Sequence, residues 1–324
     1  MSNYLVETKG LRVWFPAGGS LGKKSFIHAV DGVDLQISRG ETFGLVGESG
    51  CGKSTLGRTI LGLYEPMEGE VIYDGQKLDL SEMPSHRKKL QMIFQDPSAS
   101  LNPRMRIGDI VEEPMINFSL HGGSKERQEK VLSLFSLVGL TKEQYHRYPH
   151  EFSGGQQQRV GIARTLATEP EFIVCDEPVS ALDVSIQSQI INLLEDMQDQ
   201  LALTYLFIAH DVSVVRHISD RIGVMFLGRL VEVAEAEELV KNPLHPYTKA
   251  LIGAVPIPDP DKAKQKQRTL LEGELPSPVD PPPGCRFKTR CPYRKDCGGK
   301  CDEILPELKE TAPGHFVSCH LYGN

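Results

Sequence analysis

The stretch GESGCGKS, residues 47–54, has the residue types and spacing of a loop that binds phosphate. It fits the pattern Gly-x4-Gly-Lys-Ser/Thr, in which glycines let backbone amides turn toward phosphate oxygens. Lys53 is expected to reach the β and γ phosphates, the Ser54 hydroxyl to face Mg2+, and Thr55 to bond near the α-phosphate. The full set of expected phosphate-loop contacts is Gly47, Glu48, Ser49, Gly50, Cys51, Gly52, Lys53, Ser54 and Thr55.

A second chemical feature is the pair of carboxylates that ends the apolar run FIVCDEP, residues 172–178. Metal-assisted phosphoryl transfer needs one acid to hold Mg2+ and its waters and another to orient or deprotonate the attacking water. Asp176 and Glu177 fit those two roles in that order. Because acidic residues often simply end strands, the pair indicates a catalytic role only in combination with the phosphate loop.

The elements that must position these residues can be read from the hydrophobic pattern. Residues 5–40 contain short alternating runs such as LRVWF, which predict an antiparallel strand layer. The continuous apolar runs TFGLV, EFIVC and TYLFI, separated by helical patterns, predict a parallel sheet covered on both faces. Residues 96–158 form a helix-patterned insert, and a proline-rich passage at 256–283 leads to a cysteine-bearing tail.

The composition of the chain argues against some classes of binding partner. The chain has 324 residues, a formal charge of −7 and a pI near 5.8, which give no general attraction to nucleic acid. No run of about eighteen apolar residues and no signal peptide is visible, which predicts residence in the cytosol. Because stable disulfides are rare there, a cysteine cluster in this chain favours metal over disulfides.

A third stretch, FSGGQQQRVGIARTLA at residues 152–167, places Ser153, Gly154 and Gly155 before a helical pattern. By itself this could be a second anion-binding turn or a plain helix start. The stretch closely resembles the signature of ATP-binding-cassette (ABC) ATPases, with Phe152 where Leu is usual. The other motifs of that family follow in its order: Gln95 in QMIFQDP, Asp183 in SALD and His210 in IAHD.

The resemblance implies roles for these residues. Glu177, His210 and Gln95 would be catalytic, and Ser54, Gln95 and Asp176 would hold Mg2+. In a head-to-tail dimer, ATP on the phosphate loop of one cassette would be closed over by the partner's signature, here Ser153, Gly154, Gly155 and Gln156, with Asp183 as the D-loop. For stacking on adenine we select Phe26, with Trp14 and Phe15 as alternatives.

The same resemblance implies the fold. We expect an α/β P-loop NTPase cassette of the ABC type, with a RecA-like parallel sheet core, an antiparallel β subdomain and an α-helical subdomain, plus a small C-terminal Cys-rich regulatory tail. The expected boundaries are residues 1–95 and 159–232 for the nucleotide-binding core, 96–158 for the helical subdomain and 233–324 for the extension.

Longer stretches, including YPHEFSGGQQQRVGIAR and NPLHPYTKALIGAVP, resemble the ATP-binding subunits of dipeptide, oligopeptide and nickel importers of the DppF/OppF kind. This implies ATP-driven import of peptides or a related solute. The implied partners are a DppD/OppD-like second ATP-binding subunit, two permeases and a solute-binding protein, at the cytoplasmic face of the membrane. Alternatives are a cassette for nickel or a sugar-like solute, a soluble non-transport ABC ATPase and a phosphate-loop kinase.

Five of the seven cysteines lie in the last forty residues, and their spacing lacks the paired Cys-x2-Cys of a zinc ribbon. The importer family's tail is associated with a [4Fe-4S] cluster, which by resemblance would be held by Cys285, Cys291, Cys301 and Cys319. Cys297 competes with Cys301 for the third place, and zinc or no ligand remain alternatives. We interpret LHPY, residues 244–247, as packing the tail on the cassette.

Overall fold

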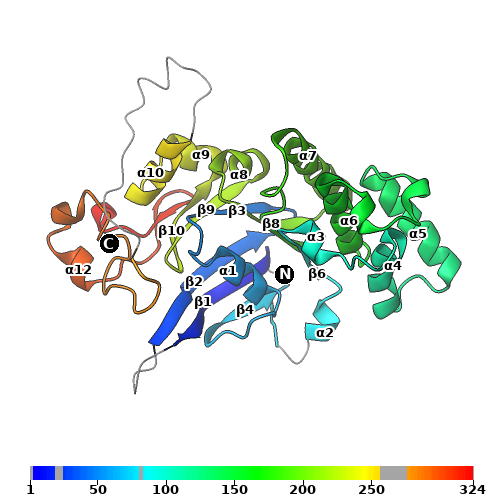
Figure 1. Ribbon diagram of the computed structural model, residues 1–324. Coiled ribbons are helices and arrows are strands. Elements are labelled where there is room, and N and C mark those ends of the chain that lie inside the picture. Colours follow the sequence, from blue (N-terminus) through cyan, green and yellow to red (C-terminus); the bar gives the residue numbers. More distant parts are fainter. Residues whose placement is uncertain (1–2, 19–24, 80–82, 256–275, 324) are drawn as a thin grey trace, which may run out of the picture. The chain divides into compact units, whose positions relative to one another are not determined.

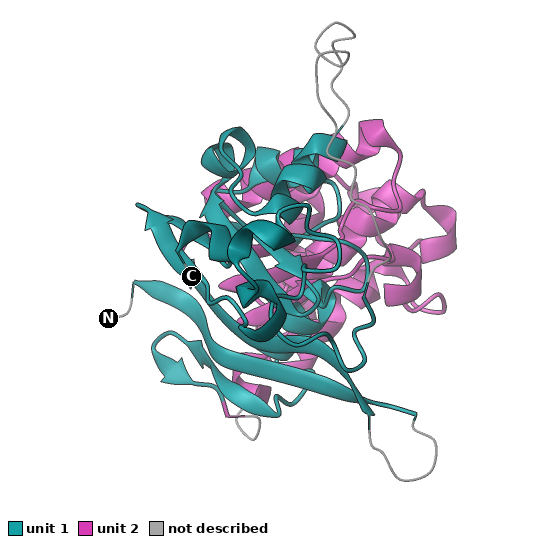
Figure 2. Ribbon diagram, turned by 90° about the vertical axis from the view of Figure 1, so that its left-hand side faces the viewer, with its two compact units in different colours: residues 1–37, 42–78, 208–324 teal, residues 38–41, 79–207 magenta. Residues whose placement is uncertain are grey.

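The computed structural model describes residues 3–18, 25–79, 83–255 and 276–323 (Figure 1). Within the proline-rich passage expected at 256–283, residues 256–275 lie outside the described part. The chain divides into two compact units (Figure 2). Unit 1 comprises residues 1–37, 42–78 and 208–324, and unit 2 comprises residues 38–41 and 79–207. Each unit therefore combines segments that are distant in the sequence.

An antiparallel sheet in unit 1 is built from long N-terminal strands. Its strand order is β2 (Ser25–Ser38), β1 (Tyr4–Ala17), β4 (Glu68–Tyr73) and β5 (Gln76–Lys77). β1 and β4 pair antiparallel, with Val6 opposite Tyr73. The C-terminal half of β2 alternates between buried and more exposed residues, as in a sheet with one face on the core. The antiparallel layer expected from the sequence is present.

The second sheet of unit 1 has a different character, because its central strands are continuous apolar runs. Phe43 to Val46 in β3 (Thr42–Val46) are fully buried, and this strand runs parallel to β9 (Arg221–Phe226). β9 pairs antiparallel with β10 (Arg229–Glu235). The same unit includes the helices α1 (Lys53–Ile60), α8 (Val212–Ile218), α9 (Ala236–Lys241) and α10 (Pro246–Ala254).

Unit 2 contains the parallel strands β6 (Leu90–Ile93) and β7 (Phe172–Asp176), followed in the chain by β8 (Thr204–Ile208). Its longest helix is α7 (Val184–Leu201), whose buried residues recur at helical spacing. The insert expected at 96–158 contains α3 (Pro97–Ser100), α4 (Ile107–Asn117), α5 (Ser124–Leu137), η1 (Lys142–Gln144) and η2 (Pro149–Glu151), and α6 (Gly154–Leu166) begins in it; α2 (Met83–His86) precedes it.

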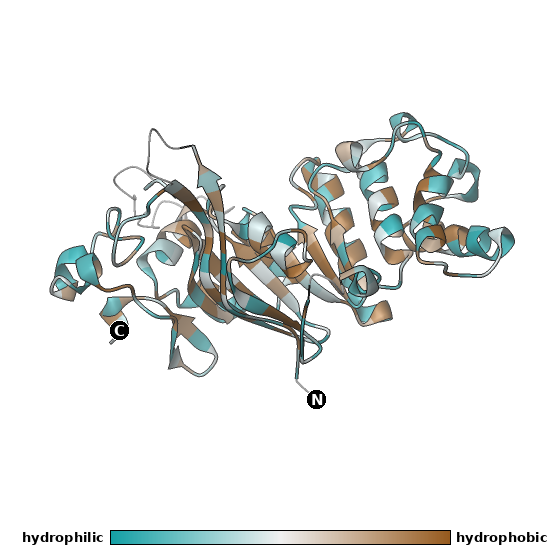
Figure 3. Cartoon of the chain, turned by 90° about the horizontal axis from the view of Figure 1, so that it is seen from below, coloured by the Kyte–Doolittle hydropathy of each residue, from teal (hydrophilic) through white to brown (hydrophobic). Residues whose placement is uncertain are grey.

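Helices of unit 2 carry both brown and teal segments along their length in Figure 3, as amphipathic helices do. α4 and α5 both pack on α6, which buries much of its length. Across the described part of the chain, no helix is both long enough and apolar enough to cross a membrane.

The C-terminal segment of unit 1 contains η3 (Arg294–Cys297), α12 (Lys300–Glu303), β11 (Lys309–Ala312), β12 (His315–Val317) and η4 (His320–Tyr322). β12 pairs with β10, where Val317 lies opposite the buried Glu232. The Glu232 carboxylate accepts from the amides of Leu244 and His245 at 2.7 and 2.8 Å, and lies 2.7 Å from His315 Nε2. The tail is therefore joined to the sheet by strand pairing and by a buried polar group.

Candidate active site

The phosphate loop lies in unit 1 and joins the end of β3 to the start of α1. Two of its glycines occupy positions that have no room for a side chain. A Cβ atom on Gly47 would lie 2.2 Å from the carbonyl oxygen of Met225. A Cβ atom on Gly52, where φ is +106°, would lie 1.9 Å from the carbonyl oxygen of Ala29. The backbone can therefore turn inward here because these side chains are missing.

Lys53 is the first residue of α1, and only 5% of it is exposed. Its ammonium group donates to the carbonyl oxygens of Gly47 at 2.8 Å and Glu48 at 3.1 Å. The first-turn amides of a helix have no partner within the helix, and the helix dipole places partial positive charge at the same end. A glycine cradle, an ammonium group and a helix N-terminus together suit the phosphates of a nucleotide.

Gln95, Asp176 and Glu177 lie in unit 2, at one edge of a pair of parallel strands. β6 and β7 are in register with Ile93 opposite Cys175, so Gln95 and Glu177 each follow two residues later at the same edge. Gln95 Nε2 donates to Glu177 Oε2 at 3.0 Å. Asp176 is 2% exposed, and Glu177 has φ of +48°, an unusual backbone conformation that often marks functional sites. Carboxylate and amide oxygens are ligands that Mg2+ prefers.

The signature turn, also in unit 2, begins α6. Ser153 is the N-cap residue: its hydroxyl accepts from Gln156 N at 3.4 Å, while Gln156 Oε1 accepts from Ser153 N at 3.1 Å. This reciprocal capping box fixes the turn. A Cβ on Gly155 would lie 2.4 Å from Cγ2 of Ile186 in α7, the helix for which Asp183 is the N-cap residue. The signature and the D-loop segment are thus packed against each other.

The remaining candidates, His210 and Phe26, lie in unit 1. His210 is exposed in the connection between β8 and α8. Phe26 is partly buried in β2, with its ring centroid 6.4 Å from that of Trp14. Phe15 packs edge-on against Tyr64, with centroids 5.3 Å apart. The adenine-stacking role of Phe26 stays a prediction.

The [4Fe-4S] cluster predicted on Cys285, Cys291, Cys301 and Cys319 is a wrong prediction. None of the seven cysteines, all of which lie within the described residues, forms a disulfide. Within the described residues, which include every cysteine, no group of three or more His, Cys, Asp or Glu side chains could hold a metal ion. The same finding argues against the zinc alternative and against Cys297 as a ligand.

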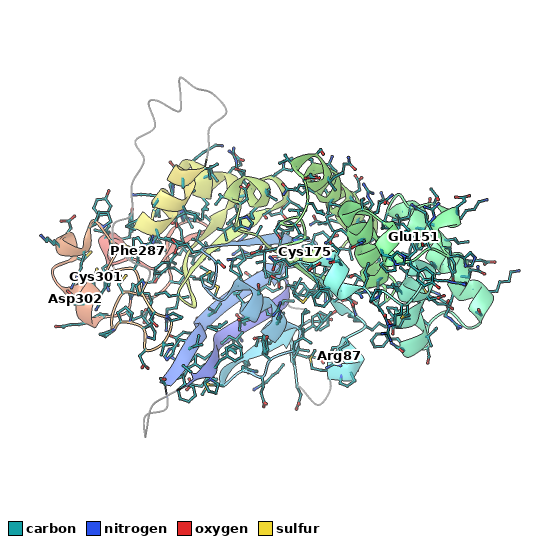
Figure 4. The ribbon with its side chains drawn as sticks, in the orientation of Figure 1. Arg87, Glu151, Cys175, Phe287, Cys301 and Asp302 are labelled. Carbon is teal, nitrogen blue, oxygen red and sulfur yellow. The ribbon has the colours of Figure 1, made fainter. Side chains whose placement is uncertain are left out.

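Two residues of the C-terminal region contact the phosphate loop, a role that their place in the sequence did not predict. Arg290 Nη1 lies 2.9 Å from Glu48 Oε1, and the Tyr247 hydroxyl accepts from Glu48 N at 2.9 Å. Tyr247 is the last residue of the LHPY stretch, interpreted as packing the tail on the cassette, and Arg290 lies in the cysteine-bearing tail. His245 of that stretch is 1% exposed, and its ring centroid lies 5.5 Å from that of Phe287, which is labelled in Figure 4.

Family models match two parts of the chain. The model for ABC transporters matches residues 30–180, which include the phosphate loop, the signature and the acid pair. The model for the C-terminal region of oligopeptide/dipeptide transporters matches residues 231–297, which include Tyr247 and Arg290.

Similar proteins cover nearly the whole chain. The oligopeptide transport ATP-binding protein AppF of Bacillus subtilis is 52% identical over 98% of this chain and 97% of its own length. The oligopeptide transport ATP-binding protein OppF of Escherichia coli is 52% identical over 97% of this chain and 95% of its own length. A dimeric structure of the ATP-binding cassette MJ0796 with ADP and Pi matches with a TM-score of 0.64 and 32% identity, over 71% of this chain and 98% of that one. The chain belongs to the oligopeptide transport ATP-binding proteins of the ABC transporter family.

Proposed function

We propose that this chain hydrolyses ATP to power the import of oligopeptides across a membrane. The observation that carries the proposal is that one chain contains both a built phosphate cradle around Lys53 and a hydrogen-bonded Gln95–Glu177 pair beside a buried aspartate. The first binds the nucleotide and the second supplies hydrolytic chemistry. The substrate class comes from the oligopeptide transport relatives and from the C-terminal region model.

In this proposal the phosphate loop binds the triphosphate. Lys53 bonds the β and γ phosphates, Thr55 bonds near the α-phosphate, and backbone amides of the other loop residues donate to the remaining oxygens. Ser54, Gln95 and Asp176 would hold Mg2+, because their oxygens suit a hard cation. Mg2+ held there would neutralise charge on the phosphates.

Glu177 accepts the proton of the attacking water. The water oxygen forms a bond to the γ-phosphorus, the bond from that phosphorus to the bridging oxygen breaks, and the electron pair leaves with ADP. Gln95, which already donates to Glu177 at 3.0 Å, orients the carboxylate and the water. His210 contacts the γ-phosphate, and Phe26 stacks on adenine.

Ser153, Gly154, Gly155 and Gln156 contact the γ-phosphate of ATP held by a partner cassette, with Asp183 beside them. Support comes from the exposed Ser153 hydroxyl at the N-terminus of the 13-residue α6. We propose an OppD-like partner cassette, two permeases and a solute-binding protein, with the chain bound peripherally at the cytoplasmic face. We assign ATP binding to residues 1–95 and 159–232, permease contact to 96–158 and regulation to the extension at 233–324.

Replacing the proposed base provides the test of hydrolysis. Glu177→Gln keeps the shape and removes the proton acceptor, so MgATP turnover should fall by at least about 100-fold while MgATP binding is retained. Glu307→Gln, at a side chain that is 78% exposed, is the matched control and should keep wild-type turnover. Unchanged hydrolysis in Glu177→Gln would remove that residue from its role.

Uptake of a labelled tripeptide by cells tests the transport assignment. Cells that lack the chain should lose uptake, wild-type chain should restore it, and Glu177→Gln should not. Full tripeptide uptake without the chain, together with normal hydrolysis by the purified protein, would favour a non-transport ATPase.

A further inference from the structure

The start of the phosphate loop is held by two side chains that come from the C-terminal region. Arg290 Nη1 lies 2.9 Å from Glu48 Oε1 and 3.1 Å from Glu48 Oε2. The Arg290 side chain is 13% exposed and the Glu48 side chain 31% exposed, so the pair is partly shielded from water. Both residues belong to unit 1, in which 242 positions of sequence separate them.

Tyr247 holds the backbone of the same residue. Glu48 N donates to the Tyr247 hydroxyl at 2.9 Å. The Tyr247 ring is fully buried, with its centroid 4.8 Å from that of Phe226 and 5.6 Å from that of Phe287. A tyrosine hydroxyl is neutral at physiological pH and has lone pairs that accept from the amide, and burial raises the pKa of Tyr247 further. A packed aromatic cluster thus gives the Glu48 amide a fixed partner.

The orientation of the Glu48 backbone matters because its carbonyl faces Lys53. Glu48 O accepts from Lys53 Nζ at 3.1 Å and from Cys51 N at 3.2 Å. A rotation of this residue would move a carbonyl oxygen that locates the ammonium group and would also change the curvature of the loop. We propose that Arg290 and Tyr247 are positioning residues for ATP: they fix Glu48 and, through it, the phosphate-binding geometry of Lys53. This inference rests on the proposed ATPase function.

A second contact keeps the same tail segment in place independently of Arg290. Arg286 Nη2 donates to Asp31 Oδ2 at 2.6 Å, and the Asp31 side chain is 5% exposed. Asp31 N donates to Gly228 O, and Gly228 N donates to Cys51 O, both at 2.9 Å. Arg286 therefore anchors the tail to the backbone that supports the loop. Because this anchor remains, loss of Arg290 alone should leave the tail docked and the protein folded.

The test compares arginine variants within one segment. Arg290→Gln should raise the Kd for MgADP and the KM for MgATP by about fivefold, as expected for a partly exposed charge pair, and should change kcat by less than about twofold. Arg290→Lys should recover most of the affinity. Arg294→Gln is the matched control, since Arg294 pairs with Asp302 inside the tail and its side chain is 48% exposed. It should bind both nucleotides as the wild type does.

Tyr247→Phe, which keeps the packed ring and removes the acceptor, should also raise both constants. A coupling measurement separates positioning from general stability. Glu48→Gln combined with Arg290→Gln should weaken MgADP binding no more than Arg290→Gln alone, because both changes break one interaction. Wild-type affinity in Arg290→Gln, an equal loss in Arg294→Gln, or additive losses in the double variant would overturn the proposal. A wild-type chain that bound neither MgADP nor MgATP would instead refute the ATPase function.

Discussion

Acid should lower the stability of unit 1 through His245, a buried histidine. His245 is 1% exposed and is the N-cap residue of α10, where its Nδ1 accepts from Tyr247 N at 3.1 Å. Accepting that bond requires a neutral ring. Burial lowers the pKa of His245 from 6.5 to about 3, and the positive charge of Lys249 acts in the same direction. The Glu232 carboxylate, close by, is bonded to the His245 amide.

The direction and size of the change in unfolding free energy follow from this pKa shift. Between pH 6.5 and about 3 the unfolded chain binds a proton at His245 that the folded chain does not, so the stabilisation is complete above pH 6.5 and is lost as the pH falls. The free energy of unfolding should fall by about 1.4 kcal/mol for each pH unit in this window. Between pH 6.5 and pH 5 the loss is about 2 kcal/mol.

Urea unfolding at pH 7, 6 and 5 measures this loss. The chain has one tryptophan, Trp14, and it lies in unit 1 with His245, so its fluorescence reports on the relevant unit. His245→Asn keeps a side chain that can cap α10 but does not titrate, and should lose about 2 kcal/mol less than wild type on acidification. His217→Asn, at an exposed position, should follow the wild type. Identical pH profiles for wild type and His245→Asn would refute the argument.

Two further predictions concern glycines. Gly52→Ala places a Cβ 1.9 Å from a backbone carbonyl oxygen of β2, so the loop must shift; MgATP binding should be lost while circular dichroism stays close to wild type. In α6, Gly155→Ala would put a Cβ 2.4 Å from a side-chain carbon of Ile186 and should destabilise the protein by about 1–3 kcal/mol. Gly161→Ala, where a Cβ would have nothing within 4 Å, should be neutral or slightly stabilising. Urea midpoints compare the α6 pair, and equal midpoints would contradict the packing argument.

The parts of the candidate site that residue types and spacing can predict are local in the chain. The phosphate loop works through contiguous backbone, and its strand and helix neighbours follow from adjacent apolar patterns. The signature turn is a capping box within four residues, Ser153 to Gln156. For such motifs, residue type and spacing largely determine the geometry, because few intervening bonds can vary. The resemblance to the importer ATPases is confirmed by the family models and by relatives that match 97–98% of the chain.

In the C-terminal tail, residue types and spacing alone do not predict metal ligation or long-range contacts. The number and spacing of its cysteines are compatible with a cluster, but no group of three or more His, Cys, Asp or Glu side chains among the described residues could hold a metal ion. The contact of Arg290 with Glu48 likewise joins residues separated by 242 positions. The sequence by itself therefore determined the nucleotide chemistry and the family. Tertiary packing alone decided which C-terminal side chains reach the phosphate loop, because long-range contacts depend on how whole elements pack and not on local spacing.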